Sequence, residues 1–363
     1  MTKPLRPDDF RRASHAVEAV VVDGLPPSLD QVADAGPASH AFLRRAWFAA
    51  AVEAYGGTPR TLVVRRGGEP ALALPLVPYG PRALGLAMAP GSYWPFRSFP
   101  LSDASEPVLA AALARLARTV NVLRIGPTPD EDPSVSPLLA AARARGWAVL
   151  DRPVGASWLF RLGDATRAGE WPRGSTLKKN RWHEKQLAAH GALDWRFAEN
   201  DDWPAAFDRL AAVEEKSWIA TRTDGRDAKF TDTGHGRFWR VAARDERLRG
   251  MMRAALLAVD GEPAAFSFDL VAGRTTYAIA NSYDPAYAKH SPGKLLYTRN
   301  LVALVERGVE LVDWGMGDSG YKQVIGADEG PALRDWLLLR PGLPAAAVRL
   351  IARWWSRSGQ TRR

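Results

Sequence analysis

The sequence predicts a mixed α/β protein with two copies of one unit, each a mixed, mostly antiparallel sheet flanked by helices. The chain has 363 residues, which suits two domains of ordinary size better than one. Each half has a short turn between two apolar runs, Arg66-Gly67-Gly68-Glu69 in the first and Asp260-Gly261 in the second. Such turns predict β-hairpins. In both halves a third apolar run, a helical pattern and a further apolar run follow.

Two short sequence echoes link the halves. Gly68-Glu69-Pro70-Ala71 recurs as Gly261-Glu262-Pro263-Ala264, and residues 120–126 resemble residues 309–315. Both matches lie at nearly the same offset along the chain, so we expect a tandem duplication whose loops are degenerate in the first copy. The expected divisions are a degenerate first domain at 1–155, a second domain at 156–345 and a basic tail at 346–363.

Apolar periodicity places the elements of the first half. Residues up to about Gly36 show only weak periodicity, and a helical pattern at 38–55 ends at Gly56-Gly57. The remaining expected elements are strands at 61–64, 71–77 and 83–89, a helix at 107–119, a strand at 122–125, a helix at 137–145 and a strand at 147–150.

The second half begins with a basic helix at residues 177–190, which is closed by Gly191. A solvated face is the default explanation of its lysines and arginine, and a surface for an acidic substrate or RNA is the alternative. The expected elements that follow are helices at 205–218 and 237–247 and strands at 254–259, 264–271 and 275–283.

Composition excludes several kinds of chemistry. The chain has no cysteine, which removes disulfides, thiolate catalysis and cysteine-based zinc sites. No histidine pair has a metal-binding spacing, and His183 and His190 are expected on the surface, so no metal is expected. No apolar run is long enough for a transmembrane helix and the N-terminal residues do not resemble a signal peptide, so we expect a cytoplasmic protein. The net charge of +9 favours an acidic partner.

A helix expected to begin at Ser291 combines an apolar stripe with a start typical of anion sites. Tyr297, Leu301, Leu304 and Val305 fall at helical spacing and must face a sheet. Ser291 is the expected N-cap residue, and the next position is a proline, which suits the first helical residue.

Gly293 keeps the backbone bare at this start, so that free N–H groups and the helix dipole form an anion site. Lys294 adds a positive charge. An ordinary capped helix is the alternative explanation. The segment is not a P-loop, because Leu295 stands where a magnesium-binding hydroxyl is needed.

The order of a strand meander, this helix start and a strand that contains Asp313 resembles CoA-dependent N-acyltransferases of the GNAT type. The segment 291–296, the helix end at 306–308 and the motif Gly317-Asp318-x-x-Tyr321-Lys322-x-x-x-Gly326 resemble the CelD/BcsL family of GNAT-like acyltransferases. That family is similar to the Fem peptidoglycan aminoacyltransferases, which also have two tandem GNAT-like domains. The resemblance covers most of the chain and is specific from Leu177 onward.

The resemblance implies that acetyl-CoA or another acyl-CoA is the co-substrate. The pantetheine arm is expected between two splayed strands. The pyrophosphate is expected at the helix start, where one glycine replaces the usual glycine-rich signature. The residues expected to bind the donor are Ser291, Pro292, Gly293, Lys294 and Leu295.

Acyl transfer needs a base for the acceptor and a proton donor for the leaving thiolate. Asp313 and Asp318 are candidate bases, Tyr321 is a candidate acid, and Lys322 is a candidate for holding a substrate phosphate or carboxylate. A strand-end residue satisfied by backbone amides is the alternative for Asp313, and an ordinary turn residue for Asp318. The residues expected to contact the acceptor are Asn281, Tyr283 and Tyr287.

The sequence therefore predicts an acyltransferase that moves an acyl group, in the simplest case acetyl, from acyl-CoA to an amine or hydroxyl. The expected acceptor is related to the cell envelope or to an exopolysaccharide and is anionic or glycan-linked, with polysaccharide-synthesis proteins as candidate partners. One alternative is a Fem-like aminoacyltransferase that uses aminoacyl-tRNA. The other is a non-catalytic scaffold in polysaccharide synthesis.

Overall fold

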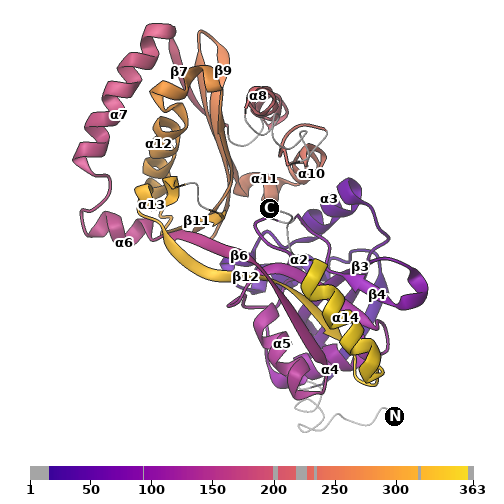
Figure 1. Cartoon of the computed structure of the whole chain (residues 1–363). Helices are drawn as coiled ribbons and strands as arrows, with labels where there is room; N and C mark the ends of the chain where they lie inside the picture. Colours follow the sequence, from indigo (N-terminus) through magenta and orange to yellow (C-terminus); the bar gives the residue numbers. More distant parts are fainter. Residues whose placement is uncertain are drawn as a thin grey trace, which may run out of the picture. The chain divides into compact units, whose positions relative to one another are not determined.

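The computed structural model describes residues 16–92, 94–198, 203–217, 227–232, 235–317 and 320–358. It has two compact units (Figure 1). Ser157–Gly330 form most of the second unit, and the first contains Gly56–Ala156 together with the chain up to Val52 and from Pro331 onward. The last strand and helix of the chain therefore belong to the first unit. The sequence instead assigned residues up to 345 to the second domain and the rest to a tail.

Most of the first unit's strands follow the order β1-β2-β3-β4-β5-β12 within the 12-stranded sheet. The pair β4 and β5 is parallel, and the other neighbours are antiparallel. Its strands are β1 (Val17–Asp23), β2 (Arg60–Arg66), β3 (Glu69–Pro78), β4 (Leu86–Met88), β5 (Val122–Pro129) and β12 (Asp328–Leu339). Its main helices are α2 (Ser28–Ala35), α3 (Arg45–Tyr55), α4 (Glu106–Ala117), α5 (Val135–Ala144) and α14 (Ala345–Ser358).

The second unit repeats this arrangement in the order β7-β8-β9-β10-β11-β6, and only β10 and β11 among these described pairs are parallel. Its strands are β7 (Leu193–Ala198), β8 (Met252–Val259), β9 (Glu262–Ala272), β10 (Thr275–Tyr283), β11 (Leu311–Met316) and the end of β6 (Ala148–Phe160). Its helices are α6 (Leu162–Arg167), α7 (Gly174–Leu187), α8 (Trp203–Lys216), α10 (Gly236–Ala242), α11 (Glu246–Met251), α12 (Pro292–Glu306) and α13 (Tyr321–Ile325).

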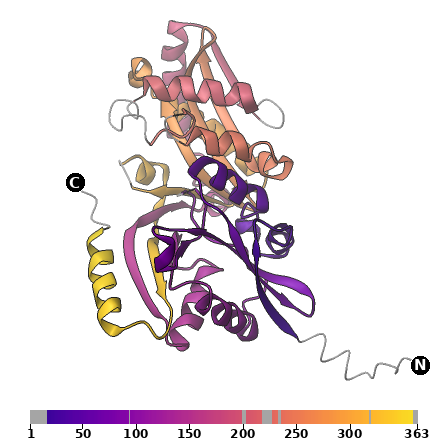
Figure 2. The ribbon, with the colours of Figure 1, turned by 90° about the vertical axis from the view of Figure 1, so that its right-hand side faces the viewer.

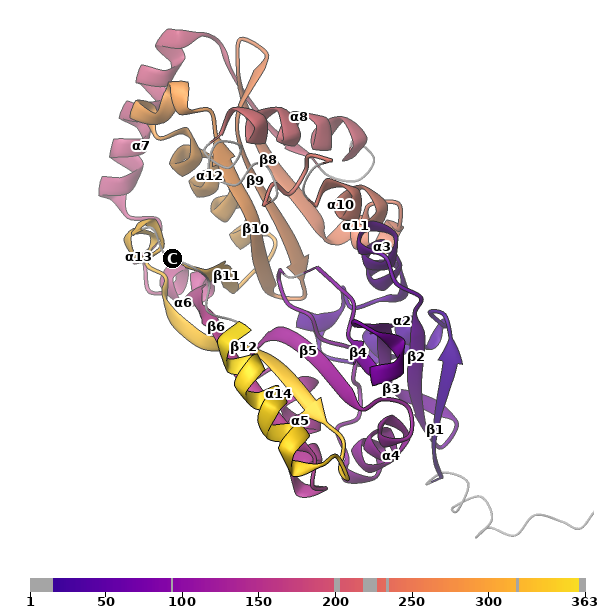
Figure 3. The ribbon, with the colours of Figure 1, turned by 45° about the vertical axis from the view of Figure 1, so that its right-hand side comes forward.

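The equal strand orders confirm the predicted fold class. The α7 and α12 helices cover one face of the second sheet and α8, α10 and α11 the other (Figures 1 and 3). The helix expected at 237–247 is two helices, because Asp245 ends the first stretch and caps α11 by accepting from the Leu248 N–H at 2.9 Å. The sequence did not predict β1, β7 or β12.

Helix α12 packs on the sheet through the stripe that the sequence predicted. Tyr297, Leu301 and Leu304 are buried, and they share a core with Val312 and Trp314 of β11. Burial of this stripe holds α12 across the strands of the second unit and thereby fixes where its N-terminus lies.

A buried polar network fixes the rotation of the same helix. Asn300 of α12 donates a hydrogen bond to the Asp269 carboxylate on β9, and Arg253 Nε donates to Asn300 Oδ1 at 2.9 Å. All three side chains are almost fully buried. Burial raises the pKa of Asp269 to about 7, although the Asn300 hydrogen bond and the Arg253 charge oppose the shift.

This shift predicts that the unit loses stability as pH rises. A carboxyl whose pKa is raised on folding stabilises the fold fully below pH 4, and that contribution is lost as pH rises towards 7. The Asp269→Asn variant cannot ionise at this position. Its free energy of unfolding should therefore increase relative to that of the parent protein as pH rises from 4 to 8, by up to about 4 kcal/mol. Urea unfolding at a series of pH values measures this difference. The control Asp208→Asn, at an exposed carboxylate, should show no such trend. A pH-independent difference for Asp269→Asn would contradict the assignment.

Candidate functional site

The parallel strands β10 and β11 pair over only three residues and then separate. Residues Thr275, Thr276 and Tyr277 face Leu311, Val312 and Asp313. Beyond this point β10 continues along β9 as far as Tyr283, whereas β11 pairs with β6 at Met316. We call the diverging ends, residues 278–283 and 314–316, the strand fork. Across the strand fork the two strands form no ladder pairs among the described residues.

Lys322 holds the bent end of β11 in place. Its ammonium donates to the carbonyl oxygens of Trp314 at 2.7 Å, Gly315 at 2.9 Å and Met316 at 3.0 Å. The side chain is 4% exposed. An ammonium has three donors, and all three are engaged. The sequence predicted that Lys322 holds a substrate phosphate or carboxylate; in the structure its ammonium is buried and donates to the strand.

Asp313 supports the same bend from the other side of the strand. Its carboxylate accepts from the Ser157 hydroxyl and from the Gly315 N–H, the latter at 2.9 Å. Burial raises the pKa of Asp313, while the two hydrogen bonds and the Lys322 charge lower it. This geometry matches the structural alternative that the sequence left open for Asp313.

The start of α12 differs from the expected cap. Ser291 has a left-handed backbone with φ of 52°, and its side chain makes no capping hydrogen bond. The N–H groups of Lys294 and Leu295 both donate to the Ser291 carbonyl, at 3.0 and 3.1 Å. Because Pro292 has no N–H, Gly293 is left with the one N–H of the first turn that can meet an anion. The helix start therefore offers fewer backbone donors than the sequence suggested.

Gly293 allows β10 to approach α12 closely. A Cβ atom at this position would lie 3.0 Å from Asn281 Oδ1 and 3.2 Å from Tyr283 Cδ1. The structure thus brings two predicted substrate residues against the predicted donor segment. The third, Tyr287, packs near His190 and the core formed by α7, β8 and β9.

Each arm of the strand fork carries a buried donor that lacks a hydrogen-bond partner among the described residues. These are Asn281 Nδ2 on β10 and Trp314 Nε1 on β11. Unpaired buried donors cost free energy, so they indicate a missing acceptor. The carbonyl oxygens of an amide-containing chain would supply such acceptors.

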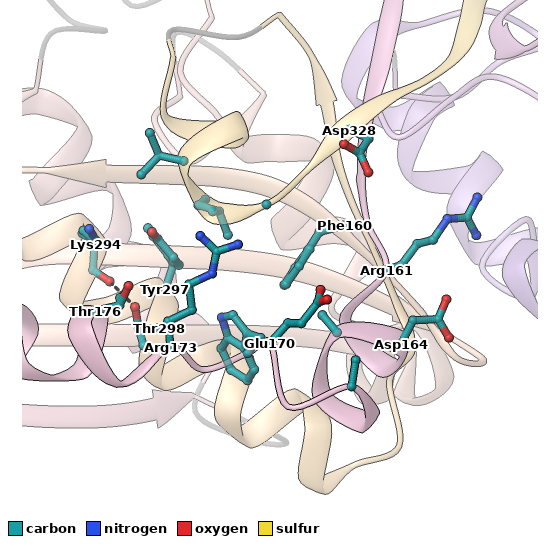
Figure 4. Close-up of a pocket in the computed structure, with 16 residues that line it drawn as sticks. Phe160, Arg161, Asp164, Glu170, Arg173, Thr176, Lys294, Tyr297, Thr298 and Asp328 are labelled. Atoms are coloured by element: carbon teal, nitrogen blue, oxygen red, sulfur yellow. Dashed lines mark hydrogen bonds between the residues drawn. The ribbon is translucent and has the colours of Figure 1, made fainter.

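A cavity of about 300 Å³ lies beside α12, and we call it the α12 pocket (Figure 4). Arg173, Thr176 and Lys294 line one end of it, and Asp164 and Asp328 lie towards the other. The aromatic side chains that line the pocket are Phe160, Trp171 and Tyr297.

The Lys294 end of the α12 pocket has an excess of positive charge. Burial and then the nearby Lys179 lower the pKa of Lys294. Burial lowers the pKa of His183 as well, followed by the charges of Lys179, Lys294 and His290. A bound anion would relieve this mutual repulsion.

A row of aromatic rings links the α12 pocket to the polar loop after β11. Trp314 lies edge-on to Tyr297, with ring centroids 5.7 Å apart, and to Tyr321, at 6.1 Å. Burial and the neighbouring Tyr321 raise the pKa of Tyr297, so its phenol stays protonated. The sequence treated Tyr297 as core only, although it was the one residue of the stripe with a hydroxyl.

Tyr321 is 40% exposed. Asp318, the other predicted base, lies outside the described residues.

Among the described residues of the first unit, another segment pairs at the equivalent place. There β4 and β5 also pair over three residues. Beyond them Arg97 exchanges backbone hydrogen bonds with β5, donating to Pro127 O at 3.0 Å and accepting from Gly126 N at 3.1 Å. The neighbouring Trp94 and Phe96 are buried.

The described residues contain no group of three or more His, Asp and Glu side chains arranged to hold a metal ion. None of their helices is both long and apolar enough to span a bilayer.

Comparison with known proteins agrees with this geometry. Residues 174–323 match the family described as acetyltransferase (GNAT) domain. The crystal structure of FemX superposes with a TM-score of 0.58 at 11% identity, covering 89% of this chain and 97% of FemX. No curated protein matches the sequence.

Two other solved structures are similar. One is a conserved protein of unknown function from Bacteroides thetaiotaomicron, with a TM-score of 0.56, 11% identity and coverage of 88% and 100%. The other is the C-terminal domain of a putative lysylphosphatidylglycerol synthetase from Agrobacterium fabrum, with a TM-score of 0.51, 16% identity and coverage of 90% and 95%. At these identities the likeness concerns the fold. Residues 174–323 of the second unit therefore match a GNAT acetyltransferase domain.

The contacts of Lys322 predict a structural role. The Lys322→Met variant keeps the volume but leaves three carbonyls without their donor and Asp313 without a nearby charge. We expect it to lower the free energy of unfolding by about 3 kcal/mol or more. The exposed control Lys185→Met should stay within about 0.5 kcal/mol of the parent. Chemical denaturation measures both. An unchanged stability together with a loss of substrate affinity would instead support substrate binding by Lys322.

Proposed function

We propose that the second unit binds an acyl-CoA at the strand fork and the α12 pocket and transfers its acyl group to an amine or hydroxyl. The observation that carries this proposal is the separation of β10 and β11 beyond Tyr277 and Asp313. The opening carries an unpartnered donor on each arm, Asn281 Nδ2 and Trp314 Nε1.

The chemistry of the opening fits an acyl-CoA. A pantetheine arm contains two amide groups, whose carbonyl oxygens suit the unpartnered donors. The Gly293 N–H and the Lys294 ammonium suit the phosphates, with Arg173 at the same end of the α12 pocket. The remaining segment residues act through the backbone: Ser291 and Pro292 set the turn, and Leu295 anchors the helix in the core.

In the proposed reaction the acceptor nitrogen or oxygen forms a bond to the thioester carbonyl carbon and loses a proton. The carbon–sulfur bond breaks, and the thiolate takes up a proton. We assign that second proton to the Tyr321 phenol, which lies beside Trp314 at the strand fork. Asp313 and Lys322 position the strand, and Asp318 is retained as a candidate base.

The proposed subfamily and acceptor rest on the sequence resemblance. We propose a member of the CelD/BcsL group that acts on an acceptor related to the cell envelope or an exopolysaccharide. Asn281, Tyr283 and Tyr287 are the proposed acceptor contacts. One observation favours a second candidate, an aminoacyltransferase that uses aminoacyl-tRNA: α7 presents exposed Lys178, Lys179 and Arg181 beside the α12 pocket.

Acetyl-CoA should stabilise the protein against heat, by about 2.7 kcal/mol at a hundred times its Kd. The Lys294→Met variant should bind acetyl-CoA about tenfold more weakly, because a partly buried cation at the phosphate end is lost. The control Lys216→Met, on α8 and away from the α12 pocket, should bind normally. Thermal shift and calorimetric titration measure both effects.

One result would contradict acyl-CoA binding. If no acyl-CoA raises the melting temperature and tRNA binds with a steep salt dependence, the aminoacyltransferase replaces the acyl-CoA-dependent acyltransferase as the proposed function. If neither acyl-CoA nor tRNA binds, the result supports the non-catalytic scaffold in polysaccharide synthesis.

The Tyr321→Phe variant should lower kcat about 10- to 100-fold and leave the Kd for acetyl-CoA unchanged, because only the proton donor is removed. Tyr297→Phe is the matched comparison on α12 and should retain most of kcat. Steady-state kinetics with binding titrations separate the two constants. If Tyr297→Phe instead lowers kcat strongly and Tyr321→Phe keeps full activity, Tyr297 is the proton donor to the thiolate.

A further inference from the structure

The C-terminal helix α14 has a buried side and an unusually apolar exposed side. Trp355 is 1% exposed and shares a core with Val348 and Ile351. On the outer side, Leu350 is 70% exposed and Trp354 52%. They lie four residues apart and therefore side by side along the helix. Large apolar side chains exposed together are unusual unless something covers them.

The inner side of α14 is fixed firmly to the first unit. The Arg152 guanidinium lies 3.9 Å from the centre of the Trp355 ring, and Arg124 lies on the same ring at 5.5 Å. Both arginines bind Asp335 of β12, at 2.5 and 2.7 Å. Arg152 also donates to the Ser358 hydroxyl at 2.8 Å. The contacts of its buried side thus set the orientation of the helix, which lies alongside strands of the first unit (Figure 2).

Three arginines lie next to the apolar pair. Arg349, Arg353 and Arg357 recur every four residues, are all exposed, and form a row beside Leu350 and Trp354. The helix contains no acidic residue that could neutralise them. A basic row beside an exposed tryptophan and leucine is the pattern of a helix that lies in a membrane interface.

We propose that the outer face of α14, formed by Arg349, Leu350, Arg353, Trp354 and Arg357, binds an anionic lipid surface. The arginines meet the phosphates of the lipid headgroups, and Leu350 and Trp354 enter the boundary between headgroups and acyl chains. An acidic protein would satisfy the arginines but gives no reason for the exposed apolar row. This binding is independent of the proposed acyl transfer, because the helix belongs to the first unit.

The test is sedimentation of the full chain with vesicles at about 100 mM salt. Binding is expected to vesicles of equal parts phosphatidylglycerol and phosphatidylcholine and not to phosphatidylcholine alone. Glycerol phosphate in solution should not compete, because the surface rather than one headgroup is recognised. Replacement of the three arginines by alanine should weaken binding about 100-fold, since each basic residue near such a surface contributes roughly fivefold. The pair Leu350→Ser and Trp354→Ser should weaken it at least about tenfold.

The matched control is Trp182→Ser, which removes an equally exposed tryptophan from the basic helix α7. It should bind vesicles like the parent. All variants change exposed side chains, and unchanged melting temperatures establish that they fold.

Four results would overturn the proposal. They are absence of vesicle binding, equal binding to neutral vesicles, retention of binding in both α14 variants, and loss of binding in Trp182→Ser. Light scattering adds a fifth: a dimer that dissociates in the Leu350 and Trp354 variant would show that a second copy of the chain covers this face.

Discussion

The functional geometry depends on one buried ammonium group. Lys322 reaches back from α13 to three successive carbonyl oxygens at the end of β11. Those carbonyls would otherwise point towards the next strand of a regular sheet, and the interaction stabilises a bent strand in place of a straight one. The separation of β10 from β11 follows, and the two arms carry the unpartnered Asn281 and Trp314 donors.

The two units show how one fold can be open or closed at the same place. Both have a parallel pair of strands that ends after three residue pairs. In the first unit Arg97 fills the position beyond with backbone hydrogen bonds, and the buried Trp94 and Phe96 pack beside it. In the second unit the chain turns instead into α12. The chemistry is therefore assigned to the second copy on the basis of hydrogen-bond geometry as well as sequence.

The site could be predicted in part because some of its features are local. Pro292 at the first helical position follows from sequence preferences, and the structure contains it, whereas the close approach of β10 to Gly293 was not predicted. Ser291 was predicted to cap through its hydroxyl, but the tight connection from the preceding 3-10 turn gives it a left-handed backbone without a capping bond. The burial of Lys322 was not predicted, for a related reason. A lysine in a polar loop usually faces water, and only the bend of β11 supplies three acceptors at its position.

By itself the sequence determined the fold class, the repeat and the buried stripe of α12, because hairpin turns and helical periodicity depend on residues close together in the chain. It did not determine β1, β7 or β12, since these strands pair with partners far away in the sequence and carry no turn signal. Only the tertiary structure decided that Asp313 and Lys322 are internal supports, that Tyr297 lines a pocket, and that α14 docks through Trp355 and leaves Trp354 exposed. Each of these depends on which side of an element meets a distant neighbour, and that choice is made when the core packs.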